Sequence, residues 1–407
     1  MVCTGVSAQN ARINYDESKV PQFELPALLT SDSGDSIRTV EEWETVRRPE
    51  ILDMLQEKMF GRTPADRIAV KWDVISENGE ALGGKATFRQ VRFTFGEGEN
   101  TLEAILLLIL PNEAKGKVPV IISYNFNGNH STCMESDILY PTKFDLIAAE
   151  DSPLRERGNQ ISRWPLEMIV DRGYAVATMC YHDIFPDRAD LRDRSAAALF
   201  PDFLNRMRDH DEWGAIGVWA WGYSRIADYL ETVGAIDSNR MAVMGHSRQG
   251  KAAVWAGAQD ERFKVVISNN SGCGGAALSK RVFGENISCI TNTFPHWFCP
   301  GLCAYAGNEQ AMPFDQHMLL AAIAPRHLYV ASAVEDRWAD PKGEYLGAYH
   351  AGEVYRLYGL KPLESMEMPP VHTPIHNDVA YHIRAGRHDV TEYDWKCYLD
   401  YCDIYMK

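Results

Sequence analysis

The chain of 407 residues lacks any apolar run long enough to span a bilayer. It also lacks an excess of positive charge, since 41 lysines and arginines stand against 56 aspartates and glutamates, a formal net charge of −15. That balance argues against nucleic acid or an anionic membrane as a partner. No linker, repeat or low-complexity tract interrupts the sequence, and its 45% of hydrophobic residues suits one large globular α/β domain.

Cysteine is scarce, and its count of nine is odd, so at least one thiol is unpaired within the chain. Cys299 with Cys303, and Cys397 with Cys402, are spaced closely enough to bridge. Neither spacing comes with a second pair arranged like a zinc site. We therefore expect mostly buried thiols, with one or two disulfides at most, and no metal or other cofactor.

The N-terminal part of the chain divides into a polar lead-in and the start of the domain. Residues 9–36 are rich in proline, serine and aspartate, which predicts an extended segment. Residues 2–9 end in a small-x-small pattern, so residues 1–8 fit the remnant of a signal peptide. We therefore expect a lead-in over residues 1–36 and a single domain over residues 37–407. Residues 39–60 have helical spacing, and Pro49 fits the first turn of a second helix there.

Strand patterns change character along the chain. Three runs between residues 68 and 110 alternate apolar and polar residues, which predicts antiparallel strands at a sheet edge. Later runs are continuously apolar and are separated by helical stretches, which predicts a parallel sheet covered on both faces. The later runs are residues 118–124, 174–179, 241–244, 263–268 and 327–333. The expected architecture is an α/β three-layer sandwich with a mostly parallel central sheet and an antiparallel N-terminal edge.

Five later segments have helical periodicity. They are residues 212–233, 248–258, 314–324, 344–358 and 394–405. Helices that alternate with buried strands in this way place polar loops beyond the carboxyl ends of the strands, which is where open parallel sheets bind ligands.

The segment 240–258 is the centre of the functional hypothesis. An apolar run leads into Gly245-His-Ser-Arg-Gln-Gly-Lys251, and small apolar residues then continue at helical density. A strand that turns sharply into a helix places the hydroxyl of Ser247 at the apex of the turn. Backbone N–H groups at the start of that helix stabilise a developing oxyanion. The match to G-x-S-x-G is imperfect, because Gln249 takes the second glycine position, and such triplets also occur in ordinary turns.

A serine nucleophile needs a base and an acid from loops further along the chain. His388 lies in a glycine-containing loop before the final helix, where a hydrolase presents its base. Asp336 and Glu335 follow the strand at 327–333, the expected place of a carboxylate that orients the imidazole. The alternatives are a surface histidine and solvated loop charges. A metal pair of His372 and His376 is disfavoured by the neighbouring prolines.

The residues together resemble the glucuronoyl esterases of carbohydrate esterase family 15, particularly the bacterial members. The matching segments cover most of the second half of the chain, and the first half matches more loosely, mainly over residues 125–130. The segments are residues 213–225, 245–251, 256–262, 268–275, 335–341, 386–388 and 394–395. The resemblance implies an α/β-hydrolase fold over residues 37–407 and a serine esterase mechanism.

Carried over by position, the resemblance implies roles for seven residues. Ser247 looks like the nucleophile, His388 the base, Asp336 the acid and Arg248 an oxyanion donor. Lys251, Glu285 and Trp338 match residues that hold the sugar, although an ion pair of Lys251 with Glu285 and core packing of Trp338 are the structural alternatives. Fungal members place a triad glutamate where this sequence has Asn270, so the acid must come from elsewhere, with Glu335 as the fallback to Asp336.

The family is implied to cleave esters between (4-O-methyl-)glucuronic acid of glucuronoxylan and lignin alcohols through an acyl-enzyme. The expected partners are such glucuronic acid esters and xylan-lignin fragments, and the expected state is a monomer. The polymeric substrate that the resemblance implies predicts a secreted or periplasmic location. One alternative is an esterase for acetyl xylan or other small carboxylic esters. Another is a non-catalytic carbohydrate-binding protein on the same scaffold, and a metal-dependent hydrolase is a third.

Overall fold

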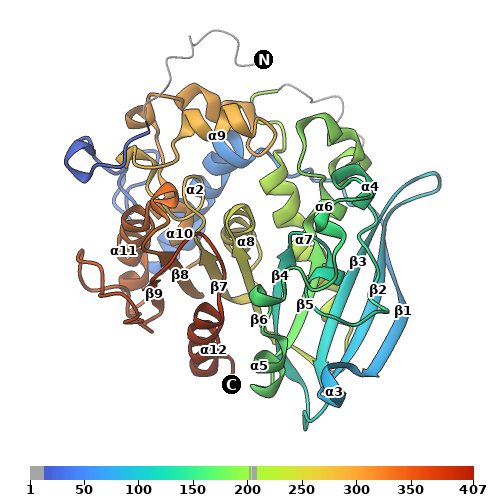
Figure 1. Ribbon diagram of the computed structural model, residues 1–407. Helices are drawn as coiled ribbons and strands as arrows, with labels where there is room; N and C mark the ends of the chain where they lie inside the picture. Colours follow the sequence, from blue (N-terminus) through green and yellow to red (C-terminus); the bar gives the residue numbers. More distant parts are fainter. Residues whose placement is uncertain (1–12, 201–202, 204–208) are drawn as a thin grey trace.

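The computed structural model describes residues 13–200, 203 and 209–407 (Figure 1). Nine strands form one sheet in the order β1-β2-β3-β5-β4-β6-β7-β8-β9. Helices cover both faces of this sheet, as the sequence predicted for an α/β sandwich. The predicted signal-peptide remnant at residues 1–8 lies outside the described residues.

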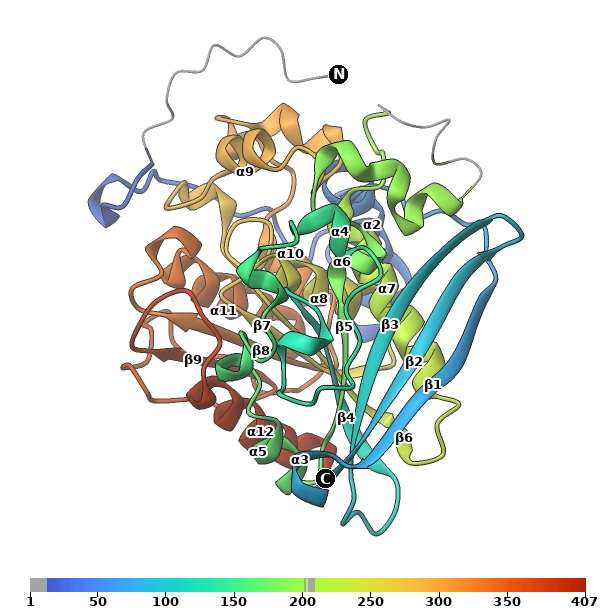
Figure 2. The same ribbon diagram turned by 45° about the vertical axis from the view of Figure 1, so that its right-hand side comes forward.

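The antiparallel edge of the sheet is built from the alternating runs of the first half of the chain. Strands β1 (Val70–Glu80), β2 (Ala86–Glu97) and β3 (Asn100–Pro111) pair as a meander. They form the long blue and cyan ribbons on the right of Figures 1 and 2. β3 is also antiparallel to its next neighbour, β5. The predicted meander is therefore confirmed, and it closes one side of the parallel sheet.

The parallel part of the sheet carries the polar loops of interest. Its strands are β4 (Val118–Asn125), β5 (Ala175–Cys180), β6 (Ile236–His246), β7 (Phe263–Asn269), β8 (His327–Ala333) and β9 (Val379–Arg384). The strand order reverses at β4, because β5 lies on one side of it and β6 on the other. Such a switch point opens a crevice at the carboxyl ends of the strands.

Two hydrophobic cores lie on opposite faces of the sheet. The larger core packs under α2 (Arg48–Leu55), α7 (Ala215–Leu230), α8 (Arg248–Gln259), α10 (Gln316–Ala321) and α11 (Pro341–Leu357). The smaller core packs under α5 (Leu166–Asp171) and α12 (Glu392–Met406). The remaining α-helices are short. They are α1 (Val40–Glu42), α3 (Ala81–Gly84), α4 (Phe144–Ile147), α6 (Tyr181–Ile184) and α9 (Ile287–Thr293).

The region 39–60 departs from the prediction of two helices. Helical backbone runs without a break from α1 through α2, with π-helical turns at Trp43–Arg47 and Gln56–Phe60. Thr39 and Glu42 form the capping box at its start. Pro49 lies in the first turn after a π-helical turn, so the missing proline N–H changes the local bonding pattern without ending the helix.

Most cysteines in the described part of the chain are free thiols. These are Cys133, Cys180, Cys273, Cys289, Cys299, Cys397 and Cys402. The expectation of buried thiols is therefore confirmed for most of them, and neither spaced pair forms a disulfide. Burial raises the pKa of Cys133 and of Cys299 to about 12, so these two thiols stay protonated.

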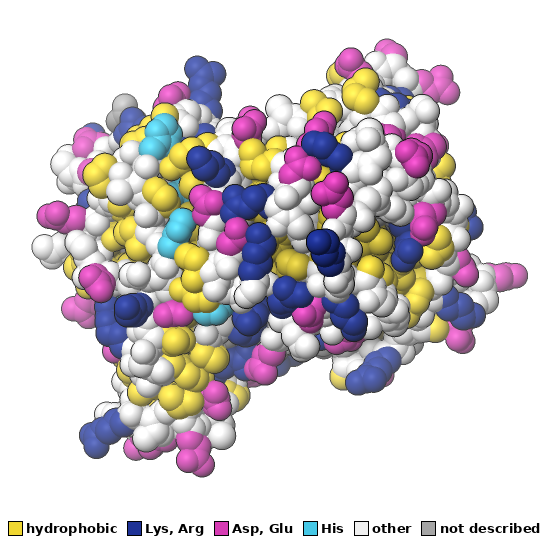
Figure 3. All heavy atoms as spheres, turned by 90° about the horizontal axis from the view of Figure 1, so that it is seen from below, with side chains coloured by type: hydrophobic (Ala, Val, Ile, Leu, Met, Phe, Trp, Pro, Cys, Tyr) yellow, Lys and Arg dark blue, Asp and Glu magenta, His cyan; other side chains and the backbone are white. Residues whose placement is uncertain are grey.

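The lead-in is extended and lies against the segment that carries Glu285. Glu17 pairs with Arg281 at 2.7 Å and with Lys342 at 3.2 Å, while the backbone N–H of Gly284 donates to the carbonyl of Asn14. On the face in Figure 3, acidic and basic side chains are interspersed. Within the described part of the chain, no helix is long and apolar enough to cross a membrane.

Candidate active site

The turn between β6 and α8 has the strained geometry expected of a nucleophile. Ser247 has a φ of 58° and a ψ of −128°, which a non-glycine residue adopts only when its surroundings enforce it. A Cβ on Gly245 would lie 1.9 Å from the carbonyl oxygen of Gln249, so only glycine fits there. The turn therefore exposes the serine hydroxyl at the start of α8, where the first N–H groups have no intrahelical partner.

Three side chains from three strand ends meet at this turn. The Ser247 hydroxyl donates to Nε2 of His388 at 2.8 Å, and Nδ1 of His388 donates to Oδ2 of Asp336 at 2.5 Å. The serine follows β6, the aspartate follows β8, and the histidine follows β9, so the parallel strands deliver all three to one edge. Asp336 is buried, with 3% of its side chain exposed, whereas 39% of the His388 side chain is open to solvent. The arrangement is a serine, base and acid relay with access for a substrate.

The other acidic candidates lie elsewhere. Glu335 is 57% exposed and faces Arg387 at 3.6 Å, away from the imidazole. Asn270 donates to the carbonyl of Asp389 at 3.2 Å, so at this position the amide holds the loop that carries His388. Asp340 caps the start of α11 and pairs with Arg281 at 2.8 Å, as expected for a residue that starts a turn.

Arg248 directly follows the serine and is held by a buried carboxylate. Its guanidinium pairs with Asp187, whose side chain is 4% exposed. The Nε–H of Arg248 is buried and lacks a partner within the described residues. A buried donor without an acceptor is costly, so a negatively charged oxygen that arrives beside Ser247 satisfies it. This geometry suits the predicted oxyanion donor.

Asp187 is the residue that sequence reasoning missed. It accepts hydrogen bonds from His296 at 2.8 Å, from the indole of Trp297 at 2.7 Å and from the hydroxyl of Tyr181 at 3.0 Å. Burial alone would raise its pKa, but the hydrogen bond from His296 and the charge of Arg248 hold the pKa well below its usual range. Its only signal in the sequence is its position in the polar loop after β5.

The predicted sugar-holding residues lie together on the next turn of α8 and the loops beside it. Lys251 and Glu285 approach to 3.7 Å and are 5% and 7% exposed, so the ion pair held as the structural alternative does exist. Lys251 also donates to the carbonyl of Ser271. Burial raises the pKa of Glu285, against the opposing charge of Lys251 and a hydrogen bond from Trp338. Trp338 is 40% exposed, which argues against a role in core packing.

A second buried carboxyl lies behind the acid. Glu344, on α11, is fully buried, accepts from the N–H of Gly272 at 3.0 Å, and is 2.6 Å from the hydroxyl of Ser332. Burial raises its pKa to about 8, and the nearby charge of Asp336 acts in the same direction. Glu344 therefore stays neutral at neutral pH.

The remaining histidine candidates are placed outside the relay. His382 is fully buried on β9, and His372 contacts the backbone N–H of Ala385. The ring of His376 lies about 6 Å from the rings of Tyr329 and Tyr401, in a tilted arrangement. In the described ranges, no cluster of three or more His, Cys, Asp or Glu side chains is arranged to hold a metal ion.

Comparisons with known proteins find relatives of this chain in both sequence and structure. Residues 166–359 match the family model for glucuronyl esterase of fungi. Over 98% of its length the chain is 39% identical to carbohydrate esterase MZ0003 from an unknown prokaryotic organism, covering 94% of that protein. A solved glucuronoyl esterase from Solibacter usitatus has a TM-score of 0.88 and 43% identity over 96% of this chain and 100% of its own. A promiscuous CE15 esterase from the marine bacterial metagenome has a TM-score of 0.88 and 38% identity, over 97% and 100% of the two chains.

Proposed function

The chain belongs to the glucuronoyl esterases of carbohydrate esterase family 15, which are carboxylic ester hydrolases with the α/β-hydrolase fold, and from that premise we propose its reaction and residues. It hydrolyses the ester between (4-O-methyl-)glucuronic acid of glucuronoxylan and an alcohol of lignin. Ser247, His388 and Asp336 form the catalytic triad. The single observation that carries this assignment is the unbroken hydrogen-bond relay from the serine hydroxyl to the buried aspartate.

Acylation uses the relay to make a nucleophile. The Ser247 oxygen attacks the ester carbonyl carbon while His388 takes the hydroxyl proton at Nε2. Asp336 holds the proton on Nδ1 and stabilises the imidazolium that forms. The carbonyl oxygen becomes an oxyanion, which the unpaired Nε–H of Arg248 and the N–H groups at the start of α8 stabilise. When the tetrahedral intermediate collapses, the bond to the alcohol oxygen breaks and His388 gives its proton to that oxygen.

Deacylation repeats these steps with water. His388 takes a proton from water, the resulting oxygen attacks the acyl carbon, and the Ser247 oxygen leaves with the proton from His388. The products are the free alcohol and the free uronic acid. Each residue returns to its starting protonation state, so the triad turns over without a further reactant.

The sugar is held on the side of Lys251, Glu285 and Trp338. Lys251 donates to hydroxyl oxygens of the uronate, and Glu285 exchanges hydrogen bonds with them. Because burial raises the pKa of Glu285, this carboxyl is less readily charged than an exposed glutamate, which lowers the desolvation cost when a sugar covers it. The exposed Trp338 offers an aromatic face to the ring. A polymeric substrate of this kind fits a secreted or periplasmic enzyme that acts as a monomer.

A broader ester range is the second candidate, because one similar esterase is described as promiscuous. The test measures kcat/KM for methyl glucuronate, benzyl glucuronate, methyl galacturonate and acetylated xylan, with Ser247→Ala as the control. We expect the glucuronate esters to be cleaved best and Ser247→Ala to lose about four orders of magnitude or more. Cleavage of acetyl esters alone would overturn the substrate, and unchanged cleavage by Ser247→Ala would overturn the triad.

A further inference from the structure

The loop that carries His388 has little regular structure of its own. It joins β9 to α12, and residues 385–389 form bends rather than a helix or a strand. The His388 side chain must nevertheless meet Ser247 and Asp336 at the same time, at 2.8 Å and 2.5 Å. A misplacement of about 1 Å in such a group can cost about 10²-fold in rate. The position of this loop therefore decides whether the proposed base is aligned.

Asp389, the residue directly after the base, is bonded to three other parts of the molecule. Its carbonyl accepts from Asn270 at 3.2 Å and from the guanidinium of Arg384 at 2.5 Å, and these donors come from the ends of β7 and β9. Its carboxylate oxygen Oδ1 accepts from the backbone N–H of Val390 at 2.9 Å and from the Nε–H of Arg163 at 2.6 Å. Of these donors, Arg163 alone comes from the first half of the chain.

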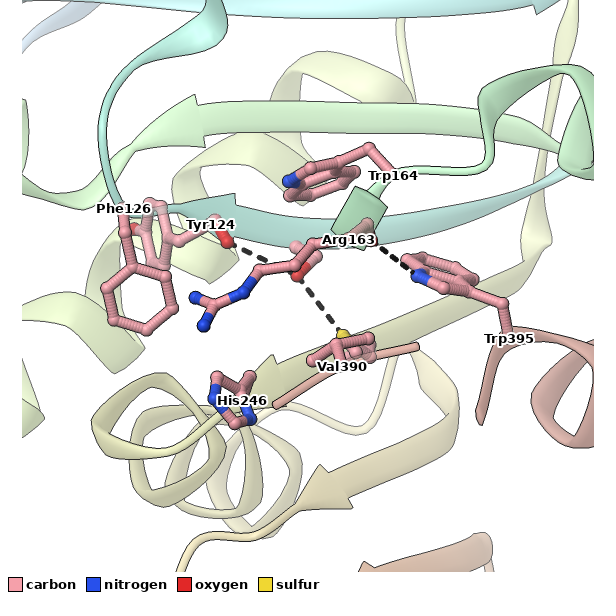
Figure 4. A pocket seen from close by; sticks show the side chains of 9 residues that line it. Tyr124, Phe126, Arg163, Trp164, His246, Val390 and Trp395 are labelled. Carbon is pink, nitrogen blue, oxygen red and sulfur yellow. Dashed lines mark hydrogen bonds between the residues drawn. The ribbon is translucent and has the colours of Figure 1, made fainter. Parts of the chain in front are cut away.

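Arg163 is fixed by contacts that do not use this N–H. Its backbone carbonyl accepts from the indole N–H of Trp395, which is buried on α12, at 2.8 Å (Figure 4). Its side chain extends toward Phe126 and His246, and its guanidinium carbon lies 5.9 Å from the ring of Phe126. The segment that supplies the donor is therefore held in place independently of the bond to the loop.

Apolar packing between this segment and the end of the loop is incomplete. A hollow of about 20 Å³ lies there, lined by Arg163, His246, Val390 and Trp395 among others. That volume is enough for about one water molecule. Side chains that line a void lack partner atoms on that side, so they restrain each other less. The hydrogen bond between Arg163 and Asp389 therefore supplies a restraint beside this hollow that the apolar contacts do not.

The ring beside the base is uncharged. The rings of His246 and His388 are 4.5 Å apart, and Nδ1 of His246 donates to Oδ1 of Asn269 at 2.6 Å. Burial lowers the pKa of His246 well below its ordinary value, and the charges of His388 and Arg163 act in the same direction. His246 therefore packs against the base as a neutral ring, while the polar hold on the loop lies at Asp389.

We propose that Arg163 is a positioning residue for the reaction: its Nε–H holds the carboxylate of Asp389 and thereby keeps His388 aligned with Ser247. The proposal rests on the proposed function, since that function assigns His388 as the base. Arg163 acts through Asp389 rather than on the substrate, so its loss slows the chemical step and leaves sugar binding unchanged. The role belongs to the N–H rather than to the charge, because the bond leaves from Nε.

The test separates the hydrogen bond from the charge at position 163. Arg163→Met removes both. Arg163→Gln places an amide N–H where Nε stands, whereas Arg163→Lys keeps the charge but carries its nitrogen one bond further out. For benzyl glucuronate we expect kcat to fall about tenfold or more in Arg163→Met, with KM within about twofold of the wild type. Arg163→Gln should recover most of the loss, and more of it than Arg163→Lys.

Arg172→Met is the matched control. Arg172 lies in the same connection between β4 and β5, and it pairs with Asp400 and Asp403 of α12 at 3.0 Å and 2.5 Å. The side chains of Arg172 and Asp400 are 31% and 40% exposed, against 28% and 44% for Arg163 and Asp389. Ion pairs with this much exposure contribute little to stability, so we expect small and similar changes in Tm for both substitutions. Only Arg163→Met should lower kcat.

A variant of the partner residue keeps the test decisive if position 163 affects folding. Asp389→Ala removes the acceptor, so we expect the same loss of kcat, and the double variant Arg163→Met/Asp389→Ala should lose no more than either single variant. The role of Arg163 is overturned by wild-type kcat in Arg163→Met, by an equal loss in Arg172→Met, or by losses that multiply in the double variant. Recovery in Arg163→Lys without recovery in Arg163→Gln overturns it as well. Failure of the wild-type protein to cleave any glucuronate ester overturns the proposed function instead.

Discussion

Two histidine–aspartate pairs lie near each other in this molecule and do different things. His388 and Asp336 are 2.5 Å apart, with 39% of the histidine side chain exposed, while His382 and Asp394 are 2.9 Å apart and fully buried. His388 of the first pair is hydrogen-bonded to the strained Ser247, whereas His382 of the second pair is hydrogen-bonded to the hydroxyl of Tyr329. The chemistry of the two pairs is the same. Access to solvent and the identity of the third group suit the first pair to the proposed catalysis and the second pair to a structural role.

The surroundings of the two aspartates reinforce this division. Asp394 also accepts from Arg384 at 2.7 Å and takes part in the capping box that starts α12, so it ties β9 to the last helix. Burial alone would raise its pKa, but the hydrogen bond and charge of His382 and the charge of Arg384 hold it below its usual value. Asp336 has a single imidazole to orient. We therefore expect mutations of the two aspartates to separate turnover from stability.

The largest effect on turnover is expected for Asp336→Asn. The amide keeps the shape but cannot hold Nδ1–H or stabilise the imidazolium, so kcat on benzyl glucuronate should fall by about 10⁴ with little change in Tm. Glu335→Gln, one residue away and exposed, is the matched control and should keep near wild-type activity. Equal activity in the two variants would mean that the acid lies elsewhere.

Asp394→Asn is expected to lower the free energy of unfolding. Removing one partner of a buried charge pair leaves Arg384 uncompensated, which typically costs about 3–5 kcal/mol. Chemical denaturation should show this loss, while kcat of the folded fraction stays within about tenfold of the wild type. A variant as stable as the wild type but inactive would erase the distinction between the two pairs.

Asp187→Asn tests a third buried aspartate, which acts through Arg248. Without the full negative charge the guanidinium is less firmly held beside Ser247, so we expect kcat to fall by about 10² with KM little changed. The exposed Asp193, on the same segment, supplies Asp193→Asn as the control. A rise in KM at constant kcat would show that Asp187 serves substrate binding alone.

The last effect is expected for Glu344→Gln, and it appears only in the pH dependence of stability. Burial raises the pKa of Glu344 to about 8 in the folded protein, against an ordinary value of 4.5. Between these values the folded state holds a proton that the unfolded state has released. Stability is therefore full below about pH 4.5 and is lost as the pH rises through 8, by up to about 1.4 kcal/mol per pH unit.

Glutamine mimics the neutral carboxyl, so the variant lacks this pH slope. Thermal unfolding at pH 5 and pH 8 should show the Tm of the wild type falling relative to that of Glu344→Gln as the pH rises. Parallel pH profiles would mean that the pKa of Glu344 is not raised in the folded protein.

The sequence predicted the sheet well where strands are uniformly apolar, and it failed where they are not. β9 was missed, because Val379–Arg384 contains a histidine and an arginine that read as loop residues. Both are buried only because Asp394, in a later helix, pairs with them. No local pattern reveals such a partner, so the last strand becomes visible only in three dimensions.

The candidate site, too, was predicted from the sequence only in part. The elbow at Ser247 and the loops of Asp336 and His388 follow from local turn patterns at strand ends, which the sequence displays. Asp187 does not, since its partners come from residues 181, 248, 296 and 297, which the fold alone brings together. The hollow that Phe126 and Leu154 line beside Arg248 has the same origin, because these two residues lie on separate loops.

The placement of the triad across three strand ends has a consequence for folding. Ser247 and His388 are 141 residues apart, and Asp336 and His388 are 52 apart, so the relay consists of long-range contacts alone. With the roles proposed for Ser247 and His388, a nascent chain that ends before β9 has its nucleophile but no base. Ester cleavage during refolding or synthesis therefore reports the docking of the final strand. The time at which activity appears measures when the fold is complete.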